Sequence, residues 1–170
     1  MNIKDIRQSI LYQLDDIEDI KIICYTDRLY HSLCSSKDFW INWYAKHQLN
    51  YPGNTYDNPK DYILEYELVL KTNQIIDDII KGKKSLYFEV NSDEINMSDL
   101  IYDPYVADDK LLRILKDIYK INFGYMFFSR DFSITYHANP FSILRYYVDK
   151  STLFKFILNL LSTGMRIMCY

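Results

Sequence analysis

The chain has 170 residues, of which 49% are hydrophobic and 25% charged, and its formal net charge is −3. This length permits one domain or two small ones, and the composition supports a buried core rather than extended disorder. The slightly acidic balance argues against a protein that holds nucleic acid or an acidic membrane surface by charge.

The sequence predicts neither a signal peptide nor a membrane-spanning segment. The N-terminus is polar, and the nearest apolar run, 154–161, is short and contains Lys155 and Asn159. The cysteines are odd in number and lie in apolar surroundings, which favours reduced thiols over a disulfide framework. They are Cys24, Cys34 and Cys169. We therefore expect an intracellular protein, in the cytoplasm or the nucleus, with no membrane partner.

The first 49 residues predict three short helices that pack on one another. Ile6, Ile10 and Leu14 recur at the spacing of one helix face. Asp15 followed by Glu18 predicts a capping box at the start of the second helix. The third helix begins after Ser35 or Ser36 and carries its large side chains on one side: Phe39, Trp40, Trp43, Tyr44 and His47.

This order of residues resembles the F-box. The resemblance covers residues 6–49, and the matching residues are Ile10, Leu11, Leu14, Asp15, the pair Ile23-Cys24, and the stretch from Leu33 to Trp40. It implies a trihelical module over residues 1–49 that docks onto the adaptor subunit of a cullin-RING ubiquitin ligase. The remainder of the chain would then hold a substrate protein of unknown identity.

The resemblance also implies where the partner is bound and where the chemistry lies. Some residues would line the interface and others the core beneath it, and the candidates are Ile10, Leu14, Ile20, Leu33 and Trp40. The ligase chemistry would belong to other subunits, so the chain is not expected to be an enzyme. The excess of Ile over Val and of Lys over Arg is typical of an AT-rich genome, and F-box-like chains of this kind resemble those of large DNA viruses.

A turn-rich stretch, residues 50–58, separates this module from a long helix predicted over residues 58–82. Asn58 is the expected cap, Pro59 the first helical residue, and Gly82 the end. We interpret it as a linker helix.

From residue 85 to residue 170 the pattern predicts a small α+β domain. Leu86 to Val90 alternate as in a strand, a helix follows from Asp108 or Asp109 to near Gly124, and two strands occupy 125–128 and 132–137. A second helix is expected from the Asn139-Pro140 cap to Gly164, and a last strand over 165–170. This βαββαβ order predicts a four-stranded sandwich of the split βαβ type, so the whole chain is assigned to the α+β class.

Catalytic, cofactor and metal sites are not indicated. The four glycines lie at segment ends, so none forms a phosphate-binding loop, and the three histidines are scattered. Cys24, His31 and Cys34 could begin a zinc site, but a fourth ligand is not evident and both cysteines fall on apolar positions. We expect core packing and no bound metal.

Two other functions remain open from the sequence. The missing Leu-Pro at the start of the motif favours a scaffold or interaction protein with no ubiquitin role. A single-stranded RNA-binding domain is the second alternative, in which Tyr87, Tyr125 and Phe127 would stack on bases. Nine basic and ten acidic residues from Ser85 onward argue against nucleic acid.

Overall fold

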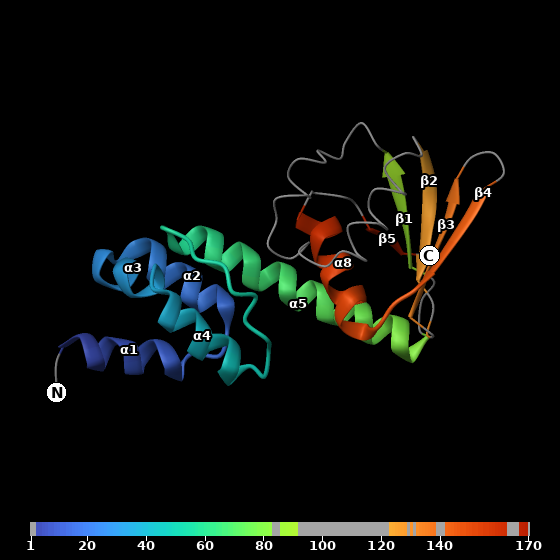
Figure 1. Cartoon of the computed structure of the whole chain (residues 1–170). Helices are drawn as coiled ribbons and strands as arrows, with labels where there is room; N and C mark the ends of the chain where they lie inside the picture. Colours follow the sequence, from blue (N-terminus) through green and yellow to red (C-terminus); the bar gives the residue numbers. More distant parts are fainter. Residues whose placement is uncertain are drawn as a thin grey trace. The chain divides into compact units, whose positions relative to one another are not determined.

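The computed structural model describes residues 3–82, 86–91, 123–128, 130, 132–138, 142–162 and 167–169, and it combines helices with an antiparallel sheet (Figure 1). The predicted α+β class is therefore confirmed. The chain divides into two compact units, residues 1–67 and 68–170, and the boundary lies within one long helix. Within the described ranges, no helix is both long and apolar enough to cross a membrane.

The first unit, called the helical unit below, contains four short helices and the start of a fifth. They are α1 (Ile3–Gln13), α2 (Ile17–Thr26), α3 (Arg28–Cys34), α4 (Lys37–Lys46) and α5 (Pro59–Lys81). Three helices were predicted before residue 50, and that number is wrong because the second is divided at Asp27. The backbone of Asp27 is extended, and its carboxylate accepts a hydrogen bond from the amide of Leu29 at 2.7 Å. A side chain that caps a new helix thus ends the old one.

Two predicted helix starts had different outcomes. Asp16, not Asp15, caps α2, and its Oδ1 accepts from the amide of Glu18 at 2.9 Å. At α5 the prediction is confirmed, because Asn58 Oδ1 accepts from the amide of Asp61 at 3.1 Å and Pro59 is the first helical residue.

Aromatic rings form the core of the helical unit. The predicted inner side of α4 is confirmed, since Phe39, Trp40, Trp43 and Tyr44 are all buried. The first turns of α5 contribute to the same core. Tyr62 stacks on Trp40 with a ring-centroid distance of 5.6 Å, and Tyr66 meets Tyr44 edge-on at 5.1 Å. The packed unit therefore includes the start of α5 as well as residues 1–49.

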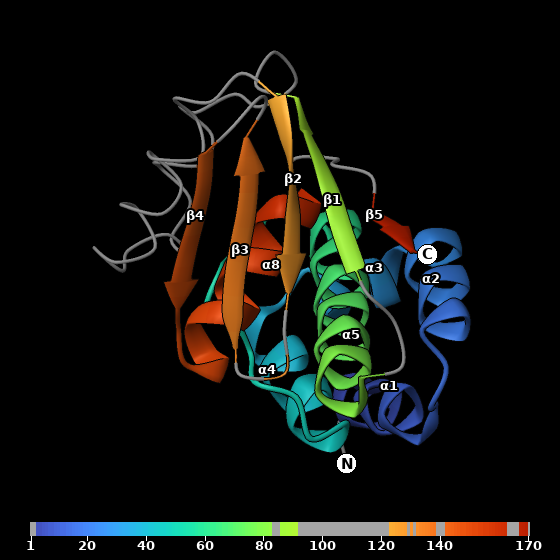
Figure 2. The same ribbon diagram turned by 90° about the vertical axis from the view of Figure 1, so that its right-hand side faces the viewer.

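The second unit, called the sheet unit, contains five described strands and one further helix. These are β1 (Leu86–Asn91), β2 (Phe123–Phe128), β3 (Ser133–Ala138), β4 (Ser142–Tyr147), α8 (Lys150–Ser162) and β5 (Ile167–Cys169). The strand order is β4-β3-β2-β1-β5, and each neighbouring pair is antiparallel (Figure 2). The final strand expected over 165–170 is thus present as β5.

The predicted four-stranded split βαβ arrangement is wrong in two respects. In that arrangement the first strand pairs with the third, whereas β1 pairs with β2 here. Residues 142–147, expected in a helix, form β4 and pair with β3, and the helix begins only after Asp149. The apolar run here fits helical spacing as well as strand alternation, so pairing with β3 decides the outcome.

Helix α8 is the centre of the sheet unit. Figures 1 and 2 both show it on one face of the sheet. Side chains around most of its circumference are buried: Thr152, Leu153, Phe156, Ile157, Leu158, Asn159, Leu160 and Leu161. A helix covered on nearly all sides is a core element rather than a surface one. The helix predicted between Asp108 and Gly124 lies outside the described residues, except that Phe123 and Gly124 belong to β2.

Candidate functional site

The five residues predicted to bind a partner do not lie on one surface. Ile20 and Trp40 are fully buried, and Leu33 is buried on α3. Leu14 is half-buried after the end of α1, and Ile10 is exposed. Three of the five therefore belong to the core, and only the two from the first predicted helix are accessible.

The apolar helix face predicted from Ile6 and Ile10 is exposed on α1 as a row of isoleucines. Ile3, Ile6 and Ile10 are 67%, 41% and 41% exposed, respectively. Their spacing of three and four places them on one face of the helix, which we call the α1 stripe. Leu11, on the neighbouring face, is fully buried. The periodicity of the sequence assigned all these residues to one apolar face but could not indicate which of them the chain itself covers.

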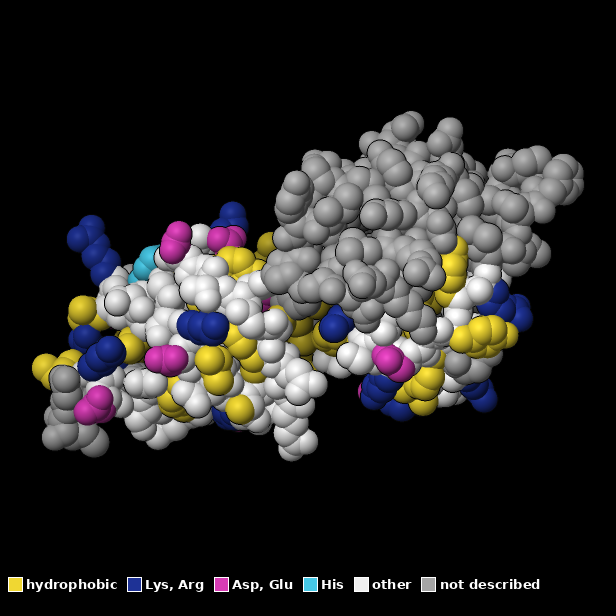
Figure 3. Space-filling view, in the orientation of Figure 1, with side chains coloured by type: hydrophobic (Ala, Val, Ile, Leu, Met, Phe, Trp, Pro, Cys, Tyr) yellow, Lys and Arg dark blue, Asp and Glu magenta, His cyan; other side chains and the backbone are white. Residues whose placement is uncertain are grey.

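A pocket of about 250 Å³ lies between α1 and α3, beside the α1 stripe. It is lined by Lys4, Arg7, Leu29, Ser32 and Leu33, and Leu29 is 54% exposed. The guanidinium of Arg7 lies 5.8 Å from the centre of the Tyr30 ring. The lining thus combines two cations with two leucines and contains no carboxylate. Figure 3 shows apolar, basic and acidic side chains interleaved at this end of the helical unit.

Helix α1 is anchored at its C-terminal end by one lysine from α4. Lys46 Nζ donates to the carbonyl oxygens of Tyr12, at 2.8 Å, and of Leu14, and it forms an ion pair with Asp15 at 2.6 Å. The hydrogen bond and charge of Lys46 lower the pKa of the Asp15 carboxyl. The ring of Tyr12 stacks on Phe39, with 5.5 Å between centroids. The α1 stripe is therefore carried by a helix that is fixed to the core on its other side.

Helix α3, which carries most of the pocket, is fixed at both ends. Asp27 caps its start, and at its end Trp40 Nε1 donates to the carbonyl oxygen of Cys34 at 2.7 Å. Cys34 is also joined to Cys24 of α2 by a disulfide, with 6.0 Å between the Cα atoms. The prediction that these thiols are reduced is therefore wrong for this structure. Cys24 and Cys34 are 10 positions apart in the sequence, and they become neighbours only because the chain turns between α2 and α3 at Asp27.

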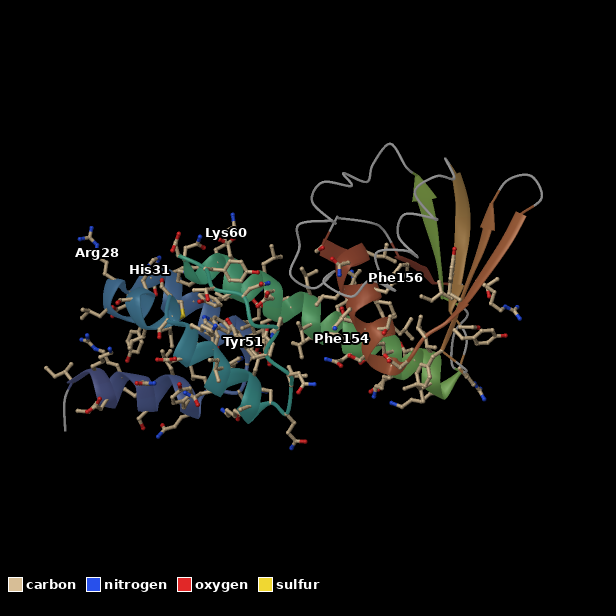
Figure 4. The ribbon with its side chains drawn as sticks, in the orientation of Figure 1. Arg28, His31, Tyr51, Lys60, Phe154 and Phe156 are labelled. Atoms are coloured by element: carbon tan, nitrogen blue, oxygen red, sulfur yellow. A yellow bond between two sulfur atoms is a disulfide. The ribbon has the colours of Figure 1, made fainter. Side chains whose placement is uncertain are left out.

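The disulfide uses two of the three residues that were considered as zinc ligands from the sequence. With Cys24 and Cys34 bonded to each other, neither sulfur is a thiolate ligand. His31 is exposed on α3 and, with Arg28, is labelled in Figure 4. In the part of the chain that the structure describes, no three His, Cys, Asp or Glu side chains are grouped as a metal site requires.

A polar cluster fastens the segment before α5 to the helical unit. The buried carboxylate of Glu65 accepts from Asn54 Nδ2 at 2.6 Å and from the Tyr56 hydroxyl at 2.9 Å. Tyr51, labelled in Figure 4, meets Tyr44 edge-on at 5.3 Å. Burial raises the pKa of both hydroxyls, so they stay protonated. These contacts position a loop and leave no activated nucleophile.

The residues proposed for RNA stacking belong to the paired strands β1 and β2. Tyr87, Tyr125 and Phe127 lie in strands whose side chains are outside the described part of the structure. The backbone register pairs Tyr87 with Phe127 and Glu89 with Tyr125. The strand order differs from the split βαβ arrangement on which that interpretation depended.

Comparison with known proteins adds no relative: no family model, no curated protein and no solved structure matches the chain. The candidate site therefore rests on the α1 stripe and the neighbouring pocket alone.

Proposed function

We propose that the helical unit is a protein-docking module of the F-box type. On this proposal the chain is a non-enzymatic adaptor that recruits a substrate protein to a cullin-RING ubiquitin ligase through the ligase's adaptor subunit. The observation that carries the proposal is the α1 stripe, three exposed isoleucines in a row beside a pocket on an anchored helix. The module would act in the cytoplasm or nucleus, of a host cell if the chain is viral.

The chemistry of this surface supports a protein partner. Fully burying a fully exposed isoleucine contributes about 1.5 to 3 kcal/mol. Ile3, Ile6 and Ile10 are 67%, 41% and 41% exposed, so each would contribute part of that on docking. Arg7 lines the pocket, and a partner carboxylate placed there would complement its charge. An amphipathic helix with an apolar face and acidic residues beside it fits both features.

The test is direct binding of the purified adaptor subunit to the full chain, measured by titration calorimetry. We expect micromolar or tighter binding, weakened at least tenfold by the double substitution Ile6→Asp, Ile10→Asp. Ile41→Asp is the matched control, because Ile41 is 40% exposed on α4 and should leave binding unchanged. A correctly folded wild-type chain that does not bind the adaptor subunit would refute the ubiquitin role.

In the scaffold alternative the same surface binds a different protein. The same variants distinguish this alternative from the ubiquitin-ligase proposal. A partner with no role in ubiquitin transfer that binds the wild type, and loses binding with Ile6→Asp, Ile10→Asp, would support it. The absence of Leu-Pro from the start of the motif is the observation that favours this alternative.

A further inference from the structure

We propose that Cys24 and Cys34 form a redox-controlled clasp that fixes α3 in the helical unit. The two cysteines lie on consecutive helices, α2 and α3, which meet at the single residue Asp27. Their Cα atoms are 6.0 Å apart, within the range that a disulfide spans without backbone movement. The pair therefore closes the α2–α3 turn covalently when it is oxidised.

Helix α3 depends on such a contact more than its neighbours do. It has seven residues, and a helix this short is marginal without tertiary support. Its N-terminal side chains, Arg28 and Leu29, are exposed, whereas its last two, Leu33 and Cys34, are buried. Asp27 caps the start of the helix, but its buried side chains are at its C-terminal end, where the disulfide is attached. Loss of the disulfide removes one of the two links at that end, and the Trp40 hydrogen bond remains.

The clasp is closed to solvent. Both cysteines are 0% exposed, so a reductant cannot reach the sulfur atoms while α2 and α3 stay packed. Exchange then requires transient opening of the α2–α3 pair, and the redox state is retained between openings. We expect reduction to accelerate in urea concentrations below the unfolding transition.

The oxidation is a two-electron exchange with a low-molecular-weight disulfide such as oxidised glutathione. One S–S bond forms between Cys24 and Cys34, and the S–S bond of glutathione breaks. Two electrons and two protons pass from the protein thiols to glutathione, which leaves as two thiols. Because cytosolic thiol pools keep such pairs reduced, the clasp would distinguish reducing from oxidising surroundings.

One consequence rests on the proposed function. Leu29, Ser32 and Leu33 of α3 line the pocket, so the state of the clasp also sets how firmly that side of the docking surface is held. The clasp itself does not depend on any partner.

The test uses the full chain, purified under reductant and then divided into reduced and glutathione-oxidised samples. Alkylation and mass measurement should find one free thiol in the oxidised sample against three in the reduced one. Both tryptophans of the chain, Trp40 and Trp43, lie in the helical unit, so their fluorescence reports on the unfolding of that unit. We expect the melting temperature of the oxidised sample to be about 10 °C higher.

Variants separate the clasp from other effects of oxidation. Cys24→Ala with Cys34→Ala should abolish the difference between the two samples, and Cys169→Ser should retain it. If the double variant does not fold, Cys34→Ser alone serves the same purpose. Three free thiols after oxidation of the native chain, or a difference in melting temperature that persists without the pair, would overturn the proposal. Neither readout involves a partner, so failure of adaptor binding leaves the result interpretable.

Discussion

Trp40 Nε1 donates a hydrogen bond to the carbonyl oxygen of Cys34 at 2.7 Å, in the fully buried core of the helical unit. This bond satisfies a carbonyl at the end of α3, which has no partner within its own helix. It also joins the helix that carries the pocket to the aromatic side of α4. The indole of Trp40 stacks on Tyr62, so the same residue links α3, α4 and the start of α5.

Trp40→Phe should therefore destabilise the helical unit by about 2 kcal/mol or more. The substitution removes the donor, leaves the Cys34 carbonyl buried without it, and opens a small cavity. Urea unfolding followed by the fluorescence of Trp43 measures the loss. Ile22→Ala, at a residue 61% exposed on α2, should change stability by less than about 0.5 kcal/mol. Equal effects of the two substitutions would contradict this account.

Lys46→Met should loosen the C-terminal end of α1. The Lys46 ammonium is the hydrogen-bond donor to the Tyr12 and Leu14 carbonyls, so its loss should cost about 1 kcal/mol, while the methionine keeps much of the apolar stem. Hydrogen exchange at the last turn of α1 should accelerate while exchange in α8 stays unchanged. In the same variant the pKa of Asp15 should rise toward its ordinary value, because Lys46 lowers it in the native chain. An unchanged Asp15 titration, followed by NMR, would contradict the ion pair.

Acid should weaken the helical unit through His47. Burial between Trp43 and Tyr66 lowers the pKa of His47 below its ordinary 6.5, and the charge of Lys46 lowers it further, although Asp15 opposes this. The unfolded chain then binds a proton before the folded chain does. The contribution of His47 to stability is accordingly present above pH 6.5 and is lost as the pH falls through the depressed value.

Urea unfolding at pH 7.5, 6.0 and 5.0 tests whether the free energy of unfolding falls as the pH falls. We expect the native chain to lose stability over this interval and His47→Gln to lose less. His31→Gln serves as the control, because His31 is exposed on α3 and its removal should leave the slope unchanged. A slope that persists in His47→Gln would assign the acid sensitivity to other groups.

In the sheet unit, Asp149→Ala should destabilise the start of α8. Asp149 Oδ1 accepts from the amide of Thr152 at 2.7 Å, a capping bond whose loss costs about 1 kcal/mol. Hydrogen exchange in the first turn of α8 should accelerate in this variant. Asp149→Asn, which retains a side-chain acceptor, should lie between the wild type and Asp149→Ala.

Features that are set by residues a few positions apart in the sequence were predictable. The buried side of α4 and the Asn58-Pro59 start of α5 follow from spacing and capping within a few residues. One helix was predicted where Asp27 divides the chain into α2 and α3, and the cap of α2 was placed at Asp15 instead of Asp16. Several acidic side chains in this stretch can cap a helix, so spacing alone does not select one.

Features that depend on contacts between segments far apart in the sequence could not be predicted. Residues 142–147 carry apolar side chains at spacings that suit a helix or a strand, and only the register with β3 selects the strand. The disulfide requires α2 and α3 to fold back at Asp27 so that Cys24 meets Cys34. The choice of which face of α1 the chain covers, leaving Ile3, Ile6 and Ile10 outside, is likewise a property of packing with α3 and α4.

The central claim, that the α1 stripe and the neighbouring pocket are a docking surface, is tested most directly by hydrogen–deuterium exchange of the full chain with and without saturating adaptor subunit. We predict protection concentrated in residues 3–13 and 28–34, and its loss in Ile6→Asp, Ile10→Asp. Protection confined to the sheet unit, or none in the first helix at saturation, would contradict the account.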